Sequence, residues 1–162
     1  MELSKESLKK TKKLLQEFKK QYLKSVSDGI RIATEAAYNK VLERCYANGI
    51  ENHTSEIYWT YDENTKTGRI YSDDMVIIFN EFGTGIVGKG NPHPNPEMFG
   101  GWEYDVNEHG EAGWKYPKGD GTFGWTRGLP SRRMFYDAFL DIKDEIGDII
   151  NVQIKGNISK LY

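Results

Sequence analysis

Residues 80–85 read NEFGTG, and the fold of the chain is inferred outward from this stretch. It follows directly on the apolar run MVIIF at residues 75–79, which is typical of a central strand covered on both faces. Gly83 would let the backbone turn sharply where that strand ends, because glycine tolerates a positive φ. Thr84 can form a hydrogen bond across the same turn. The stretch therefore predicts a central strand that ends in a tight turn.

Two more strands are expected before this run. Strand-forming residues occur at 57–61 (IYWTY), and a polar turn at 62–68 separates them from RIY at 69–71. Residues 72–74 (SDD) would turn the chain again into the apolar run. The pattern predicts an antiparallel meander, with the helices of the chain as its cover.

The first 47 residues have the periodicity of helices. Apolar residues recur three or four positions apart from Leu15 to Val41, which places them on one stripe. A single helix over this stretch would extend on the order of 65 Å, which is long for a small domain. We therefore predict a break at residues 25–29, where Gly29 lowers helix propensity and Ser27 or Asp28 can cap a second helix. Asn48 and Gly49 predict its end.

Residues 83–128 form a long segment that contains twelve of the seventeen glycines and four of the five prolines. Such a segment is usually functional or ordered into short strands. Residues 102–104 (WEY) and 113–116 (GWKY) could pair as a hairpin through a turn at 107–110. After it, Ser131 is a candidate N-cap for an amphipathic helix that continues to about residue 150. Residues 152–162 are expected to form a short edge strand or a loose arm.

These elements predict an α+β fold with N-terminal helices, an antiparallel sheet of about four strands, a long Gly/Trp-rich loop and a C-terminal amphipathic helix. We expect residues 1–27 to form a lysine-rich helix or arm. Residues 28–162 are expected to form the α+β domain, with residues 83–128 inserted in it as a loop.

Composition and charge disfavour several classes of protein. The net charge is −2 and the pI is about 6.0, which disfavours a generally basic nucleic-acid binder. The single cysteine has no partner for an internal disulfide. No run of about 18 apolar residues could span a bilayer, and the N-terminus lacks the apolar region of a signal peptide. We therefore expect an intracellular protein without a membrane partner.

Charge is distributed unevenly along the chain. Residues 1–26 carry eight lysines against three glutamates, whereas residues 137–148 carry five acidic residues against one lysine. This polarity allows identical subunits to pack head to tail, with the basic end of one against the acidic end of the next. Two separately solvated helix faces are the simpler explanation of the same polarity.

No residue pattern points to catalysis. The histidines at 53, 93 and 109 show no metal-ligand spacing with one another or with Cys45. Residues 83–88 (GTGIVG) superficially match a dinucleotide-binding motif, but the residues that follow (KGNPHP) are expected not to open the required helix. We expect no catalytic residue, no metal and no cofactor. A small enzyme without a recognisable motif remains an alternative.

Two kinds of binding function are also open. The lysine-rich N-terminal helix could contact nucleic-acid phosphates, and the aromatic loop could stack on bases or glycans. Alternatively, the exposed helix, the loop and the terminal arm are elements that a subunit lends to its neighbours in a ring.

The order of motifs favours assembly. Residues 75–85 resemble the strand ending in (V)EFGTG of a family of phage morphogenesis proteins, the head–tail joining or tail-completion proteins of long-tailed phages. Residues 125–138 (WTRGLPSRRMFYDA) resemble the Gly-x-Pro signature before the last helix of that family. Residues 88–94 (GKGNPHP) and 113–117 (GWKYP) resemble the variant found in prophages of Gram-positive bacteria. The resemblance covers roughly residues 28–150, and the chain departs from it at Arg133, near which the family usually has proline.

This resemblance implies a ring-forming structural protein between the portal-adaptor assembly and the tail tube. Its partners would be other copies of itself and phage connector, neck and tail proteins, with non-specific contact to DNA in the lumen. It would assemble in the host cytoplasm and remain in the virion.

The resemblance also assigns roles to individual residues. Glu81 is expected to pair with Arg127 or Arg132, and Phe82 and Phe135 to pack between sheet and last helix. The residues expected to maintain the fold or the intersubunit contacts are Glu81, Phe82, Gly83, Thr84, Gly85, Gly128, Pro130, Arg132 and Phe135. The loop residues expected at an interface are Trp102, Trp114 and Trp125.

Overall fold

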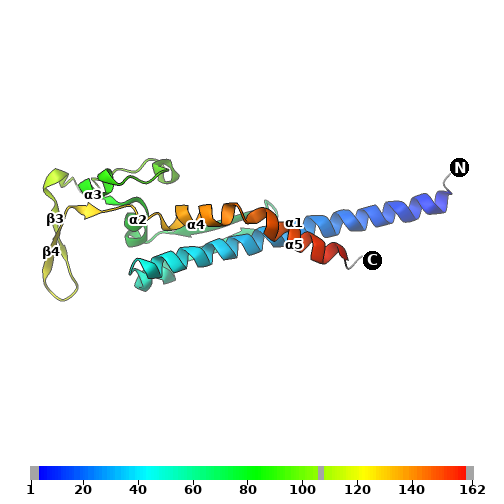
Figure 1. The fold of residues 1–162 in the computed structure, drawn as a ribbon, viewed down its shortest axis with the longest axis horizontal. Helices are drawn as coiled ribbons and strands as arrows, with labels where there is room; N and C mark the ends of the chain where they lie inside the picture. The colour runs from blue at the N-terminus through cyan, green and yellow to red at the C-terminus, as the bar shows by residue number, and fades with distance from the viewer. Residues whose placement is uncertain (1–3, 106–107, 160–162) are drawn as a thin grey trace. The chain divides into compact units, whose positions relative to one another are not determined.

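The computed structural model describes residues 4–105 and 108–159, and its fold is α+β, as predicted (Figure 1). Helices make up most of the described chain, and three of them are short 3-10 helices. The α-helices are α1 (Lys5–Ala47), α2 (Met75–Phe82), α3 (Gly85–Gly90), α4 (Met134–Lys143) and α5 (Ile146–Ile158), and the 3-10 helices are η1 (Glu51–Glu56), η2 (Pro96–Phe99) and η3 (Gly110–Ala112).

The strands form two separate antiparallel pairs, not one sheet of about four strands. The first pair joins β1 and β2, as the alternation at residues 57–71 predicts. The second joins β3 and β4, with Trp114 opposite Thr126 and Pro117 opposite Phe123. The strands are β1 (Ile57–Asp62), β2 (Thr67–Ser72), β3 (Trp114–Pro117), β4 (Phe123–Thr126) and β5 (Gly128–Leu129).

The chain divides into two compact units. The first unit comprises the residues up to Ala37, the segment Trp59–Arg69 and the residues from Asp141 onward. The second unit comprises Tyr38–Tyr58 and Ile70–Leu140, and it contains all of the family-like motifs.

Helix α1 is continuous from Lys5 to Ala47, so the predicted break at residues 25–29 is wrong. Its end agrees with the prediction. Gly49 adopts a φ of 70°, and the Asn48 side-chain amide donates to the Arg44 carbonyl at 2.8 Å. Its first four turns are exposed, as the lysine-rich sequence predicts.

Small residues in the middle of α1 allow close packing instead of breaking the helix. Ser25 and Gly29 lie four positions apart on one face, and both are buried. The Asn157 side chain of α5 donates to the Ser25 hydroxyl at 3.1 Å. A Cβ added to Gly29 would lie 2.8 Å from Cγ1 of Ile150. These contacts offset the helix-propensity cost of glycine, which is about 1 kcal/mol.

A different face of α1 contacts the β1–β2 hairpin. The Ser27 hydroxyl lies 2.6 Å from the Tyr61 hydroxyl, and the Lys66 amine donates to Ser27 Oγ at 3.2 Å. Thr34, two turns further along, occupies the space that a side chain on Gly68 would need. The residues that suggest a helix break are therefore contact positions on two faces.

The apolar run at residues 75–79 lies in helix α2, so the predicted central strand is wrong. The Asp74 carboxylate caps this helix by accepting from the Val76 amide at 2.6 Å, and its other oxygen lies 2.6 Å from His53 Nδ1. Gly83, with a φ of 81°, ends the helix, and its amide donates to the Phe79 carbonyl at 2.8 Å. A five-residue apolar run suits a buried helix as well as a strand, and the capping by Asp74 favours the helix.

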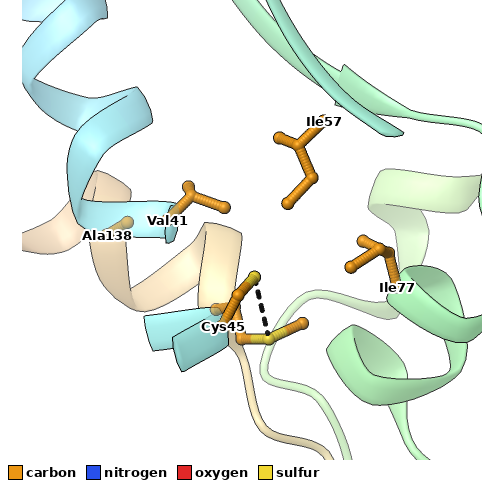
Figure 2. Close-up of a cluster of buried hydrophobic side chains, with 6 residues drawn as sticks. Val41, Cys45, Ile57, Ile77 and Ala138 are labelled. Atoms are coloured by element: carbon orange, nitrogen blue, oxygen red, sulfur yellow. Dashed lines mark hydrogen bonds between the residues drawn. The ribbon is translucent and has the colours of Figure 1, made fainter. Parts of the chain in front are cut away.

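A hydrophobic core fills the second unit. Figure 2 shows the side chains of Val41 and Cys45 from α1 gathered with those of Ile57 and Ile77. Met134 and Ala138 of α4 complete the cluster, and both are fully buried. The start of α4 is therefore fixed against α1 and α2 by apolar contact.

The C-terminal region differs from the prediction in three ways. The expected single helix is divided into α4 and α5, and residues 152–158, expected as a strand or arm, belong to α5. Residues 160–162 of the expected arm lie outside the described residues. Ser131 does not cap α4; its hydroxyl donates to the Glu81 carbonyl at 2.7 Å.

The Gly/Trp-rich loop also pairs differently. β3 pairs with β4 and not with residues 102–104, because that segment is bonded to the turn after α2: the Gly85 amide donates to the Tyr104 carbonyl at 2.6 Å. The expected turn at 107–110 falls partly outside the described residues. Residues 85–90 form the short helix α3 inside the expected loop, and this helix ends at Gly90, so KGNPHP at residues 89–94 does not open a helix, as predicted. Because α3 follows another helix, it also lacks the strand that a dinucleotide site requires.

The close packing at Gly29 can be tested by substitution. Gly29→Ala should lower the free energy of unfolding by about 1–3 kcal/mol, because the added methyl group overlaps Ile150. Gly156→Ala is the matched control on α5, where no atom lies within 4 Å of an added Cβ. It should stabilise the protein by up to about 1 kcal/mol through helix propensity. Urea unfolding followed by circular dichroism measures both, and a stabilising Gly29→Ala would contradict the packing described here.

Candidate functional site

Glu81, in the last turn of α2, is the buried polar centre of the second unit. Only 3% of its surface is exposed. Its carboxylate accepts hydrogen bonds from the backbone amides of Phe135 at 2.8 Å and Tyr136 at 3.0 Å. A third bond joins it to Nε2 of His93 at 3.1 Å. Three donors from two distant segments thus converge on one side chain.

The two amide bonds make Glu81 a long-range cap for α4. The first amides of a helix have no partner within it, and they carry the positive end of the helix dipole. A carboxylate satisfies both requirements. Here it comes from a residue 54 positions before Phe135, so one side chain fixes the end of α2 against the start of α4.

Backbone bonds reinforce this junction. The Arg132 amide donates to the Asn80 carbonyl at 2.8 Å, and the Arg133 amide donates to the Glu81 carbonyl at 3.3 Å. With the Ser131 hydroxyl on the same Glu81 carbonyl, three consecutive residues cover the last carbonyls of α2. The free carbonyls at the end of α2 therefore accept hydrogen bonds from the residues directly before α4.

His93 is held as a neutral donor. Its Nδ1 accepts from the Asn95 amide at 3.0 Å and therefore carries no proton. This assigns the ring proton to Nε2, which faces Glu81. The ring packs against Phe82 at a centroid distance of 4.7 Å and edge-on against Tyr136 at 5.2 Å. Both ring nitrogens are thus hydrogen-bonded within the chain, and the ring contacts two aromatic side chains.

The glycines and Thr84 of the motif allow two backbones to meet. Thr84 bridges Leu129, and Gly85 bridges Gly128, both antiparallel. The Thr84 hydroxyl accepts from the Leu129 amide at 3.2 Å, so it bonds to a distant segment and not across the local turn as predicted. Side chains on Gly85 or Gly128 would overlap the opposite backbone, and a Cβ on Gly83 would lie 2.7 Å from the Ser131 nitrogen.

The three tryptophans occupy different surroundings. Trp102 donates to the Gly83 carbonyl at 2.8 Å and stacks on Phe82 at 5.1 Å, so it packs against the motif. Trp114 is half-buried and stacks on His109 at 5.2 Å. Trp125, on β4, is 60% exposed. Of the three, Trp125 is the one open to a partner.

Two of the predicted pairings need correction. Glu81 does not pair with Arg127 or Arg132, because its oxygens face His93 and the α4 amides. The Arg132 guanidinium donates instead to the Asn48 carbonyl. Phe135 packs against the apolar core, and Pro130 is exposed. Phe82, predicted to pack between sheet and last helix, instead ends helix α2 and packs against His93 and Trp102. His93, the main partner of Glu81, has no signal in the sequence beyond its place between two prolines.

Cys45, the single cysteine of the chain, is not activated as a nucleophile. It is fully buried, and its Sγ lies 3.7 Å from the Met134 sulfur. Burial, together with the negative charge of Glu81, raises the pKa of Cys45 to about 11. Because the thiolate is the nucleophilic form, Cys45 is held as an unreactive thiol.

In the described residues, no group of three or more His, Cys, Asp and Glu side chains could hold a metal ion. Nor does that part of the chain contain a helix long and apolar enough to cross a membrane. Comparison of the chain with protein-family models, curated proteins and solved structures gives no match.

The role of the Glu81 cap can be measured. Glu81→Ala should lower the free energy of unfolding by about 3 kcal/mol or more, because it leaves His93 and two helix amides without their acceptor. Glu81→Gln keeps one acceptor oxygen and should cost less. Chemical unfolding followed by tryptophan fluorescence is suitable, since Trp102 stacks beside the motif.

The control is Glu63→Ala, an exposed carboxylate in the turn between β1 and β2, which should change stability by less than about 0.5 kcal/mol. Equal effects of the Glu81 and Glu63 substitutions would show that the cap contributes nothing.

The state of Cys45 predicts its reactivity. In the folded protein at pH 8, modification by a thiol reagent such as iodoacetamide should be slower by orders of magnitude than in the protein unfolded in urea, because burial and the raised pKa both suppress the thiolate. Mass spectrometry over time measures both rates. Similar rates in the two states would contradict this assignment.

Proposed function

We propose that the chain is a structural protein of the head–tail junction of a bacteriophage or prophage, acting in tail completion or head–tail joining by ring assembly. One observation carries the proposal. The two segments by which the chain resembles that family, residues 80–85 and 128–135, bind each other directly through Glu81, Thr84 and Gly85. Motifs that are separate in the sequence are thus parts of one structural junction.

The surroundings of these motif residues support a scaffold role. Glu81 and His93 are 3% and 2% exposed, and their polar atoms are engaged by other parts of the chain. A general acid or base must reach a substrate proton, which this pair is not placed to do. The buried motif is best explained as the framework that presents surfaces to other subunits.

Exposed aromatic residues supply such a surface on the β3–β4 hairpin. Phe123 and Trp125 alternate on β4 and are therefore on the same face. Both are exposed, whereas the exposed Tyr116 of β3 pairs with Gly124 and lies on the other face. Aromatic side chains of this kind are enriched at protein interfaces. In the proposed function, the hairpin contacts connector, neck or tail proteins during assembly in the host cytoplasm and later in the virion.

Nucleic-acid binding is the second candidate, favoured by the lysines of α1. Residues 5–20 are exposed, and their lysines could contact phosphates. In a ring subunit the same charge would serve non-specific contact with DNA in the lumen. As a principal function, it requires DNA affinity that falls steeply with salt and with removal of Lys9, Lys10, Lys12 and Lys13.

Deletion of the gene tests the proposed function. An in-frame deletion in a lysogen that carries it should yield, after induction, filled heads and free tails that do not join, because the junction is incomplete. Electron microscopy of the lysate counts joined particles, and plasmid-borne wild-type protein should restore them. Normal numbers of joined, infectious particles from the deletion strain would overturn the proposal.

A further inference from the structure

The N-terminal part of α1 carries an exposed apolar stripe. Leu8, Leu15, Phe18 and Tyr22 recur at spacings of seven, three and four, the pattern of a helix that packs along another element. Leu15 is 63% exposed. An open hollow lies along this stripe, called here the lysine hollow. It is lined by Leu8, Thr11, Lys12, Leu15, Gln16 and Lys19.

A second hollow of the same kind lies in the same unit, where α5 runs beside α1. It combines apolar side chains with two carboxylates, and Val152 within it is 63% exposed. It is called here the acidic hollow, and it is lined by Ile32, Glu145, Asp148, Ile149, Val152 and Gln153.

The two hollows are complementary. Each offers aliphatic surface, and the two lysines of one match the two carboxylates of the other. They cannot meet within one copy. Lys12 and Ile32 lie on the same continuous helix, twenty residues apart, which places them on the order of 30 Å from each other. A matching surface must come from a different molecule.

We propose that the lysine hollow of one copy docks on the acidic hollow of a second copy of this chain. The proposal rests on the proposed function and names the contact by which the subunits of the ring would join. Because the two surfaces differ, a pair of copies still has one lysine hollow and one acidic hollow free. Such a contact repeats from copy to copy and produces a closed ring or an open filament.

Charge gives no attraction to the simpler pairing of two N-terminal segments. Lys12 and Lys19 border the stripe on the same side, so an antiparallel pair would bring lysine against lysine. In a parallel pair these lysines would face Leu14 and Gln21, with no carboxylate in reach. DNA is a poorer occupant, because phosphates would leave Leu15 and Phe18 in water.

The test uses the full chain and an exchange of charges. K12E/K19E reverses the lysine hollow, and E145K/D148K reverses the acidic one. Each variant alone should raise the concentration for half-maximal self-association by about tenfold or more, because attraction becomes repulsion across the contact. An equimolar mixture should associate again, since each variant then offers the surface that the other needs. Sedimentation velocity measures all of these.

The matched control is K13E/K20E, which makes the same change in net charge on the opposite face of the helix and should leave association unchanged. Wild-type association should also weaken with salt. Circular dichroism checks that every variant is folded.

Four results overturn the inference: wild-type protein that stays monomeric at low salt and high concentration, an equal effect of K13E/K20E, no recovery in the mixture, or association that neither charge reversal weakens. The last result would mean that the copies join through another contact, and it would not refute the proposed function. Conversely, normal virions from the deletion strain would refute the proposed function while leaving self-association through these hollows intact.

Discussion

The contact between the Glu81 carboxylate and the first amides of α4 is the constraint on which the second unit depends. It fixes where α2 ends, where α4 begins and how far apart they lie. The buried His93 ring is hydrogen-bonded to the same Glu81 carboxylate, and Trp102 donates to the Gly83 carbonyl in the adjoining turn. The glycines follow from this arrangement, because only a backbone without side chains can pass so close to residues 128–131.

Features specified by neighbouring residues could be predicted from the sequence. The end of α1 at Ala47 follows from Asn48 and Gly49, and the β1–β2 hairpin follows from alternation on either side of a polar turn. The α+β class and the exposed lysine-rich start of α1 follow from the same local patterns. The hydrogen-bonding role of Thr84 could be predicted, but its partner, the Leu129 amide, lies 45 positions along the chain and not across the turn.

Features decided by distant contacts could not be predicted. Ser25 to Gly29 have weak helix propensity, yet their small side chains allow contacts with Ile150 and Tyr61 that stabilise the continuous helix. The run at 75–79 suits helix and strand alike, and the cap on Asp74 decides between them. For the site, the sequence indicates Glu81 but not its partners. A buried glutamate suggests an arginine as its partner, whereas this carboxylate binds two backbone amides and a histidine. Nothing in the sequence pattern indicates these partners.

The bridges between Thr84 and Leu129 and between Gly85 and Gly128 close the base of a long excursion of the chain. Residues up to Tyr104 anchor that excursion to the motif. Beyond them, its length is nearly free to change, because doubling a closed loop costs only about 0.6 kcal/mol. The β3–β4 hairpin can therefore change in length at little cost in folding free energy. Insertions or deletions in it should leave the junction from which it emerges unchanged.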